Sequence, residues 1–189
     1  MSGEDKKLAS TALMVMGAIA KNQQGSEFSA QVTQRIAESL KASQSQQTSA
    51  ALIAALGNSG DSKHEALVKD YLQGDSSRLR AQAASALGKI PGDSSLTALS
   101  SQLNQESDSK VQSAIIKALG NNDLTADHIN TVYQYASSST NRDVRSGAID
   151  ALSLQAKDNA SVRPQLVQLL KSEKNKRNLG QLMKALYGS

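Results

Sequence analysis

The 189-residue sequence contains no cysteine, no tryptophan and only two prolines. The absence of cysteine excludes disulfide frameworks, thiolate metal sites and cysteine nucleophiles. One Phe and four Tyr are too few aromatic side chains for a packed β-sandwich or for most surfaces that stack nucleic-acid bases. The prolines, Pro91 and Pro164, leave long stretches that suit helices. Ala, Leu, Ser and Gln make up nearly half of the chain, and Ala and Leu favour closely packed helices.

The net charge of +4 is unevenly distributed along the chain. Residues 141–189 hold nine Lys and Arg against four Asp and Glu, a local charge of +5, so the preceding residues are close to neutral. This basic end indicates either a solvated terminal helix, which we favour, or a surface that contacts an anionic partner.

No run of about 18 apolar residues occurs, so we expect no membrane span. Residues 8–20 are apolar enough to compare with a signal peptide. However, Glu4 and Asp5 lie where a basic region belongs, and Ser10 and Thr11 interrupt the apolar run. We therefore interpret this segment as a helix of the fold, expect no signal or transmembrane segment in a soluble chain, and assign no compartment.

A repeat is the main feature of the sequence. Six similar segments align on the anchor residues Met16, Leu56, Leu87, Leu119, Leu152 and Leu186. Their spacings are 40, 31, 32, 33 and 34 residues, and self-similarity at such a period is typical of a helical solenoid. Apolar residues recur three, four and eight positions before the anchor, which forms one stripe of a helix.

Two small residues flank the anchor. The position before it is Ala in five copies and Val15 in the first, which predicts a close approach by a neighbouring helix. Gly follows the anchor in four copies, at positions 17, 57, 88 and 120, and we predict that it ends each helix. A second amphipathic segment lies between successive anchors. The predicted capping residues are Ser29, Asp61 or Ser62, Asp93 or Ser94, Thr125 and Ser161.

The pattern of the third copy resembles that of HEAT-like repeats. It consists of Asp75, Arg80, Ala83, Ala86, Leu87 and Gly88, and it weakens to Asp108 with Gln112 and to Asp143 with Arg145 in later copies. The resemblance implies an α-solenoid in which the Asp and Arg positions form a polar ladder between repeats. It also implies that first helices line the convex side and second helices the concave side. We predict that Arg80 is structural and bonds to Asp75, or to a carboxylate or carbonyl of the adjacent repeat.

Segments 54–72 and 77–90 are also similar to the superhelical α domain of vitellogenin-type large lipid transfer proteins. The lipid-binding β-sheets of that family have no counterpart in this sequence, so lipid transport is not implied.

The sequence holds few groups suited to catalysis or to metal binding. His64 and His128 each open a second helix and lack the spacing of metal ligands, so we expect no metal and no cofactor. The segment 57–61 lacks the Lys of a phosphate-binding loop, and no serine-nucleophile motif occurs. The basic residues of 171–177 lack interleaved aromatic side chains, so we do not expect nucleic-acid binding.

We predict one all-α domain over residues 1–189, a right-handed superhelix of about six HEAT-like repeats, the last one half a repeat. The expected repeats span residues 4–43, 44–74, 75–106, 107–139, 140–172 and 173–189. The favoured function is a non-enzymatic interaction scaffold that binds a protein or a peptide. We expect the chain to be a monomer, and it could be a fragment of a larger protein. The alternatives are the helical part of a lipid- or carrier-binding assembly and, more remotely, a HEAT-like enzyme such as a lyase or glycosylase. The predicted partner-binding residues are Gln34, Glu38, Lys69, Gln102, Gln134, Gln168, Lys174, Lys176 and Arg177.

Overall fold

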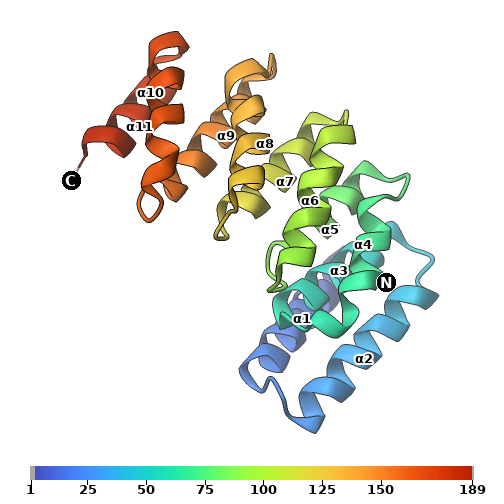
Figure 1. The fold of residues 1–189 in the computed structure, drawn as a ribbon. Coiled ribbons are helices and arrows are strands. Elements are labelled where there is room, and N and C mark those ends of the chain that lie inside the picture. The colour runs from blue at the N-terminus through green and yellow to red at the C-terminus, as the bar shows by residue number, and fades with distance from the viewer. Residues whose placement is uncertain (1–2, 189) are drawn as a thin grey trace. The chain divides into compact units, whose positions relative to one another are not determined.

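The computed structural model describes residues 3–188 and the side chains of residues 9–188. This part of the chain forms eleven α-helices and two short 3-10 helices, with no strand, so the predicted all-α solenoid is confirmed (Figure 1). The chain divides into two compact units, Met1–Ala98 and Leu99–Ser189, and the division falls inside one helix, α6. Each unit is a row of helix pairs.

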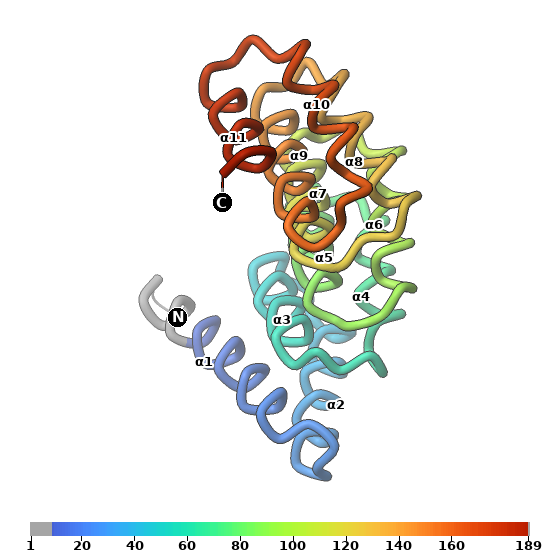
Figure 2. Tube along the Cα trace, turned by 60° about the vertical axis from the view of Figure 1, so that its left-hand side comes forward, coloured from blue at the N-terminus to red at the C-terminus, as the bar shows by residue number. Residues whose placement is uncertain are grey.

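The first unit contains five complete α-helices, one short 3-10 helix and the beginning of α6. In chain order the elements are α1 (Gly3–Asn22), α2 (Glu27–Ala42), α3 (Gln46–Ser59), η1 (Ser62–His64), α4 (Glu65–Leu72), α5 (Ser77–Leu87) and α6 (Asp93–Gln105). The first helices of the repeats, α1, α3 and α5, pack side by side in that order, and α2 and α4 pack against them (Figure 2).

The second unit repeats this arrangement. After the end of α6 it contains α7 (Ser109–Gly120), α8 (Ala126–Ser138), α9 (Arg142–Gln155), η2 (Ala160–Val162), α10 (Arg163–Ser172) and α11 (Lys176–Tyr187). The first helices α7, α9 and α11 are neighbours in that order, and α8 and α10 pack against α9. The alternation of first and second helices predicted from the repeat is therefore present in both units.

The anchor leucines form the core. Leu56, Leu87, Leu119 and Leu152 are fully buried, and Leu186 is nearly so. Met16, the anchor of the first copy, is instead 40% exposed. Among the described helices α1 packs only against α2 and α3, so one side of it stays open.

Two of the four glycines after the anchors have a different role from the one predicted, whereas Gly120 is the last residue of α7. Gly17 and Gly57 do not end their helices, because α1 and α3 continue to Asn22 and Ser59. A Cβ built on Gly17 would lie 2.2 Å from the carbonyl oxygen of Ala55 in the next first helix. The glycine therefore allows two helix backbones to touch, while Gly88 does occupy the C-cap of α5 as predicted.

The helix caps predicted from the sequence are confirmed in part. Thr125 caps α8 and Asp61 caps η1, as predicted. Ser161 was predicted as a cap but lies inside η2, and Asn159 caps that helix instead. The N-cap of α2 is Ser26, and the predicted Ser29 is instead buried, donating its hydroxyl to the Ala20 carbonyl at 2.8 Å. A buried serine hydroxyl inside a helix needs such an acceptor, which the sequence did not reveal.

Candidate functional site

Two of the predicted partner-binding residues lie together on α2. The Gln34 amide donates to the Glu38 carboxylate at 2.8 Å, one helical turn away, and both side chains are exposed. They border a hollow of about 480 Å³ that Met16, Phe28 and Val32 also line. This surface is mixed in character, with apolar side chains beside a polar pair.

Two other predicted residues are engaged within the fold. The Lys69 ammonium lies 2.6 Å from the Glu65 carboxylate and 2.5 Å from the Ser94 hydroxyl, which ties α4 to the start of α6. The half-buried Gln102 amide donates to the Glu106 carboxylate at 3.2 Å. These contacts stabilise the scaffold and leave less of each side chain for a partner.

The remaining predicted glutamines, Gln134 on α8 and Gln168 on α10, are exposed. Their two helices are joined by a polar contact in which the Gln165 amide donates to Asn130 at 3.0 Å. The second helices of this unit therefore present a polar surface, with hydrogen bonds between neighbours.

The predicted basic residues Lys174, Lys176 and Arg177, hereafter the basic segment, are all exposed. They surround Asn175, whose side chain caps α11 by accepting the backbone N–H of Arg177 at 3.0 Å and of Asn178 at 3.3 Å. Among the described residues no ion pair joins any of the three to an acidic group, although the charge of Arg177 acts on Asp150. Two cations in the first turn of a helix oppose the helix dipole, so this placement carries an electrostatic cost.

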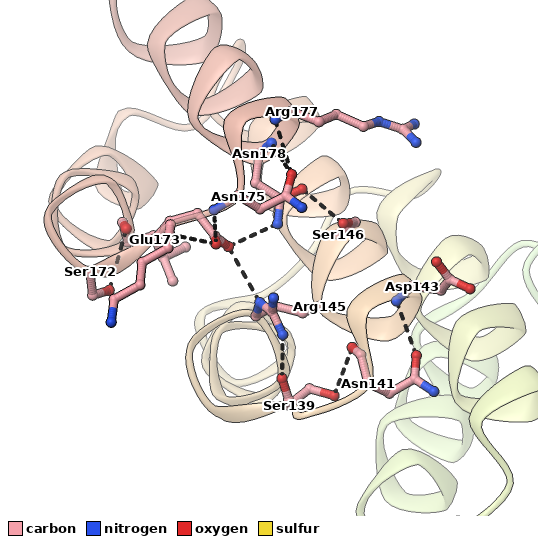
Figure 3. Close-up of polar contacts among 12 residues, drawn as sticks. Ser139, Asn141, Asp143, Arg145, Ser146, Ser172, Glu173, Asn175, Arg177 and Asn178 are labelled. Carbon is pink, nitrogen blue, oxygen red and sulfur yellow. Dashed lines mark hydrogen bonds and ion pairs between the residues drawn. The ribbon is translucent and has the colours of Figure 1, made fainter.

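The basic segment stands on a buried polar cluster (Figure 3). One oxygen of Glu173 accepts the backbone N–H of Lys174 and of Asn175, both at 2.8 Å. The other accepts the Asn178 amide at 2.8 Å and lies 3.4 Å from the Arg145 guanidinium. Figure 3 shows the Arg177 side chain extending away from this cluster. The backbone that carries the cations is thus fixed while their side chains remain accessible.

The same contacts change the acidity of Glu173. Burial alone raises the pKa of a carboxyl group, but here hydrogen bonds from Asn178, Asn175 and Lys174, with the charge of Arg145, outweigh it. The pKa of Glu173 therefore lies below its ordinary value, and the group is a carboxylate near neutral pH.

Arg80 is structural, as predicted. Its guanidinium donates to the backbone carbonyls of Gly74 at 3.0 Å and Asp75 at 2.9 Å. Arg145 donates to the carbonyl of Ser139 at 2.8 Å, so both arginines reach six residues back along the chain. Gln112 does the same toward Glu106, at 2.7 Å. We call this contact the turn clip, because it holds the turn that precedes a first helix.

Two tyrosine contacts were missed by the sequence analysis. The Tyr71 hydroxyl donates to the Leu40 carbonyl at 3.3 Å, and the Tyr135 hydroxyl donates to the Leu103 carbonyl at 2.5 Å. Each hydroxyl bonds a carbonyl near the end of the preceding second helix, where the last carbonyls lack an i+4 donor. The Leu40 carbonyl also accepts the backbone N–H of Ser43 at 3.2 Å. The available signal was the presence of Tyr at matching positions of the second and fourth repeats.

The two histidines do not form a cluster. His64 lies 4.0 Å from Asp61, and its pKa is lowered mainly by burial. Across the described residues, no group of three His, Asp or Glu side chains is placed to hold a metal ion. No helix in the described part of the chain is long and apolar enough to cross a membrane.

Paired helices stacked through their first members define a helical repeat protein, an α-solenoid. The family model of HEAT repeats matches residues 33–120 and again 97–186, and the chain belongs to this family. No curated protein sequence matches the chain. The similarity to the vitellogenin-type α domain stays a prediction.

Two solved structures share the fold. One is an engineered protein from a structural genomics consortium, 18% identical, with a TM-score of 0.60 over 99% of this chain and 92% of that one. The other is a designed armadillo repeat protein, 16% identical, with a TM-score of 0.54 over 95% of this chain and 92% of that one. At these identities the likeness concerns the fold alone.

Proposed function

We propose that this chain is a non-enzymatic scaffold that binds an acidic region of a partner protein. The observation that carries the proposal is the basic segment, Lys174, Lys176 and Arg177, which is exposed, unpaired and fixed on a buried cluster. A preorganised group of cations gains binding energy without the entropic cost of ordering a loop. The repeat fold supports the same role, because solenoids offer extended surfaces for other macromolecules.

The two alternatives have no comparable support. Among the described residues no catalytic constellation singles out a lyase or glycosylase, and binding of a fatty acid such as oleate would test the lipid-binding alternative. We therefore keep the scaffold as the proposed function.

The test is partner capture with the full chain as bait and mass spectrometry as readout. We expect the wild-type chain to enrich proteins with acidic segments. The triple variant Lys174→Glu, Lys176→Glu, Arg177→Glu should lose them, because opposite charge now repels the partner.

A matched control separates a specific loss from a change in net charge. The variant Lys110→Glu, Lys117→Glu, Arg142→Glu changes three exposed cations of the same unit by the same total charge. Retention of the acidic partners by this control and their loss from the first variant support the proposal. Equal loss from both variants, or no acidic partner with the wild-type chain, contradicts it.

A further inference from the structure

The small-residue contact between first helices is altered at one point of the second unit. A Cβ built on Gly120 of α7 would lie 2.6 Å from the Ala151 Cβ of α9, so these helices touch closely. The next repeat has Ser153 where Gly is expected, and Ala185 is the matching residue of α11. Ser153 and Ala185 both line an open groove of about 780 Å³. The larger serine side chain thus occupies the position at which Gly17, Gly57 and Gly120 allow a close contact with the next first helix.

The groove between α9 and α11 has an apolar floor and a cationic rim. Leu154, which is 45% exposed, lines it together with Ala156 and Ala185. The cations that line it are Lys157, Lys184 and Arg163, contributed respectively by the segment after α9, by α11 and by α10. An apolar surface beside several cations suits a ligand that carries both an apolar group and a carboxylate.

These cations are available for a ligand. Among the described residues, Lys157 and Lys184 are exposed and form no ion pair. Arg163 donates one N–H to the Leu186 carbonyl at 2.7 Å, which orients the guanidinium and leaves its other N–H groups. Asp150 is the acidic residue that lines the groove. Burial raises the pKa of Asp150, although Arg177 and a hydrogen bond from Gln181 act in the opposite direction.

The number of cations favours an acidic peptide over a fatty acid. Lys157, Lys184 and Arg163 all line the groove, so a ligand with more than one carboxylate can contact several of them. A fatty acid brings a single carboxylate.

We infer that the groove between α9 and α11 binds a peptide segment in which acidic and apolar residues alternate. The apolar residue contacts Leu154 and Ala185, and the carboxylates contact Lys157, Lys184 and Arg163. This inference rests on the proposed scaffold function and adds a second contact point, distinct from Lys174 and Lys176.

The probe is a fluorescein-labelled short peptide of alternating Glu and Leu, titrated with the full chain and followed by fluorescence anisotropy. We expect saturable binding that the double variant Lys157→Glu, Lys184→Glu weakens by about tenfold or more. The variant Lys110→Glu, Lys117→Glu has the same change of charge on α7 and should shift the Kd by less than about twofold.

Further substitutions test the apolar floor and the one acidic residue. Leu154→Ser should weaken binding, because it removes the exposed apolar contact. Asp150→Asn should tighten binding, because it removes repulsion of the ligand carboxylates. Ser153→Gly should weaken it by restoring the closer approach of α9 and α11, and urea unfolding will show that each variant remains folded. A peptide of alternating Glu and Ser should bind more weakly than the Glu and Leu peptide.

Several outcomes overturn the inference. Binding that depends on Lys174 and Lys176, and not on Lys157 and Lys184, places the peptide on the basic segment and leaves the proposed function intact. Binding of oleate without binding of the peptide assigns the groove to a lipid instead. No saturable binding of the peptide by the wild-type chain rejects the inference, whereas the capture of acidic proteins tests the proposed function separately.

Discussion

Gly57 of α3 and Ala86 of α5 are in direct backbone contact: a Cβ built on Gly57 would lie 2.5 Å from the Cα of Ala86 and 2.7 Å from its Cβ. Real Cβ atoms do not approach other atoms so closely, so any larger residue at position 57 separates the two helices. The stacking of first helices therefore depends on this glycine.

Gly57→Ala should lower the free energy of unfolding by about 1–3 kcal/mol, the usual cost of overpacking a tight interface. Urea denaturation followed by circular dichroism measures the loss. Gly180→Ala in α11 is the control, because its Cβ would meet no atom within 4 Å. Since Ala has the higher helix propensity, this control should gain about 0.5–1 kcal/mol. A neutral Gly57→Ala would show that the helices are not held at this distance.

Leu119→Ala should destabilise the chain by about 2–4 kcal/mol, as truncation of a buried leucine does. Leu119 is the anchor of α7 and is fully buried. The comparison is Leu154→Ala, a leucine that is 45% exposed and should cost far less. Chemical denaturation measures the free energy of unfolding of both variants. Similar decreases in the two would mean that the anchor positions do not define the core.

Tyr135→Phe should cost about 1 kcal/mol, because it removes the hydrogen bond to the end of α6 and leaves the Leu103 carbonyl without its donor. The ring remains, so packing is preserved. Tyr133→Phe on the same helix is the matched control, because the Tyr133 hydroxyl has no such bond. The difference between the two melting temperatures is the measurement, and an equal effect would contradict the assigned role of the hydroxyl.

The stability of the chain should depend on the protonation of Glu173. Because the pKa of Glu173 is lower in the folded chain than its ordinary value, the unfolded chain binds this proton more readily. The stabilisation is present above the ordinary pKa and is lost as pH falls through the folded value. Glu173→Gln should therefore lose stability at neutral pH, and its deficit should shrink as the solution is acidified. A constant deficit between neutral and acidic pH, measured by urea unfolding, would contradict this.

The repeat made the fold predictable from the sequence, because its anchors and helix pairs recur with a nearly constant period. The sequence correctly indicated that the glycines after the anchors have structural roles. In α1 and α3, however, they allow a close contact with the next helix and do not end their own helix. A glycine near a helix end and a glycine at a helix contact give the same sequence signal, and only the neighbouring backbone distinguishes them. Ser29 was mistaken for a cap for a similar reason. Serine is common at helix caps, but a serine inside a helix can also donate its hydroxyl to a neighbouring helix, as Ser29 does to Ala20 of α1.

The candidate site was less predictable. Exposure of the basic segment followed from its charge at the start of the last helix. Its attachment through Glu173 and Arg145, however, depends on contacts between residues far apart in the sequence. The engagement of Lys69 by Ser94 likewise spans 25 positions of sequence. In the sequence, Ser153 departs from the repeat because other copies have glycine at this position. That this departure leaves a groove between α9 and α11 could be inferred only from the structure, in which the glycines allow a close helix contact.

The turn clips have a consequence for where a protease can cut the chain. A protease binds its substrate in an extended form, so a turn whose carbonyl is bound by Arg80, Gln112 or Arg145 has to release that bond before cleavage. The turn from residue 23 to 26, between α1 and α2, is exposed throughout and holds Gly25 in a left-handed conformation. Limited digestion should therefore begin at this turn, while the clipped turns of both units resist longer.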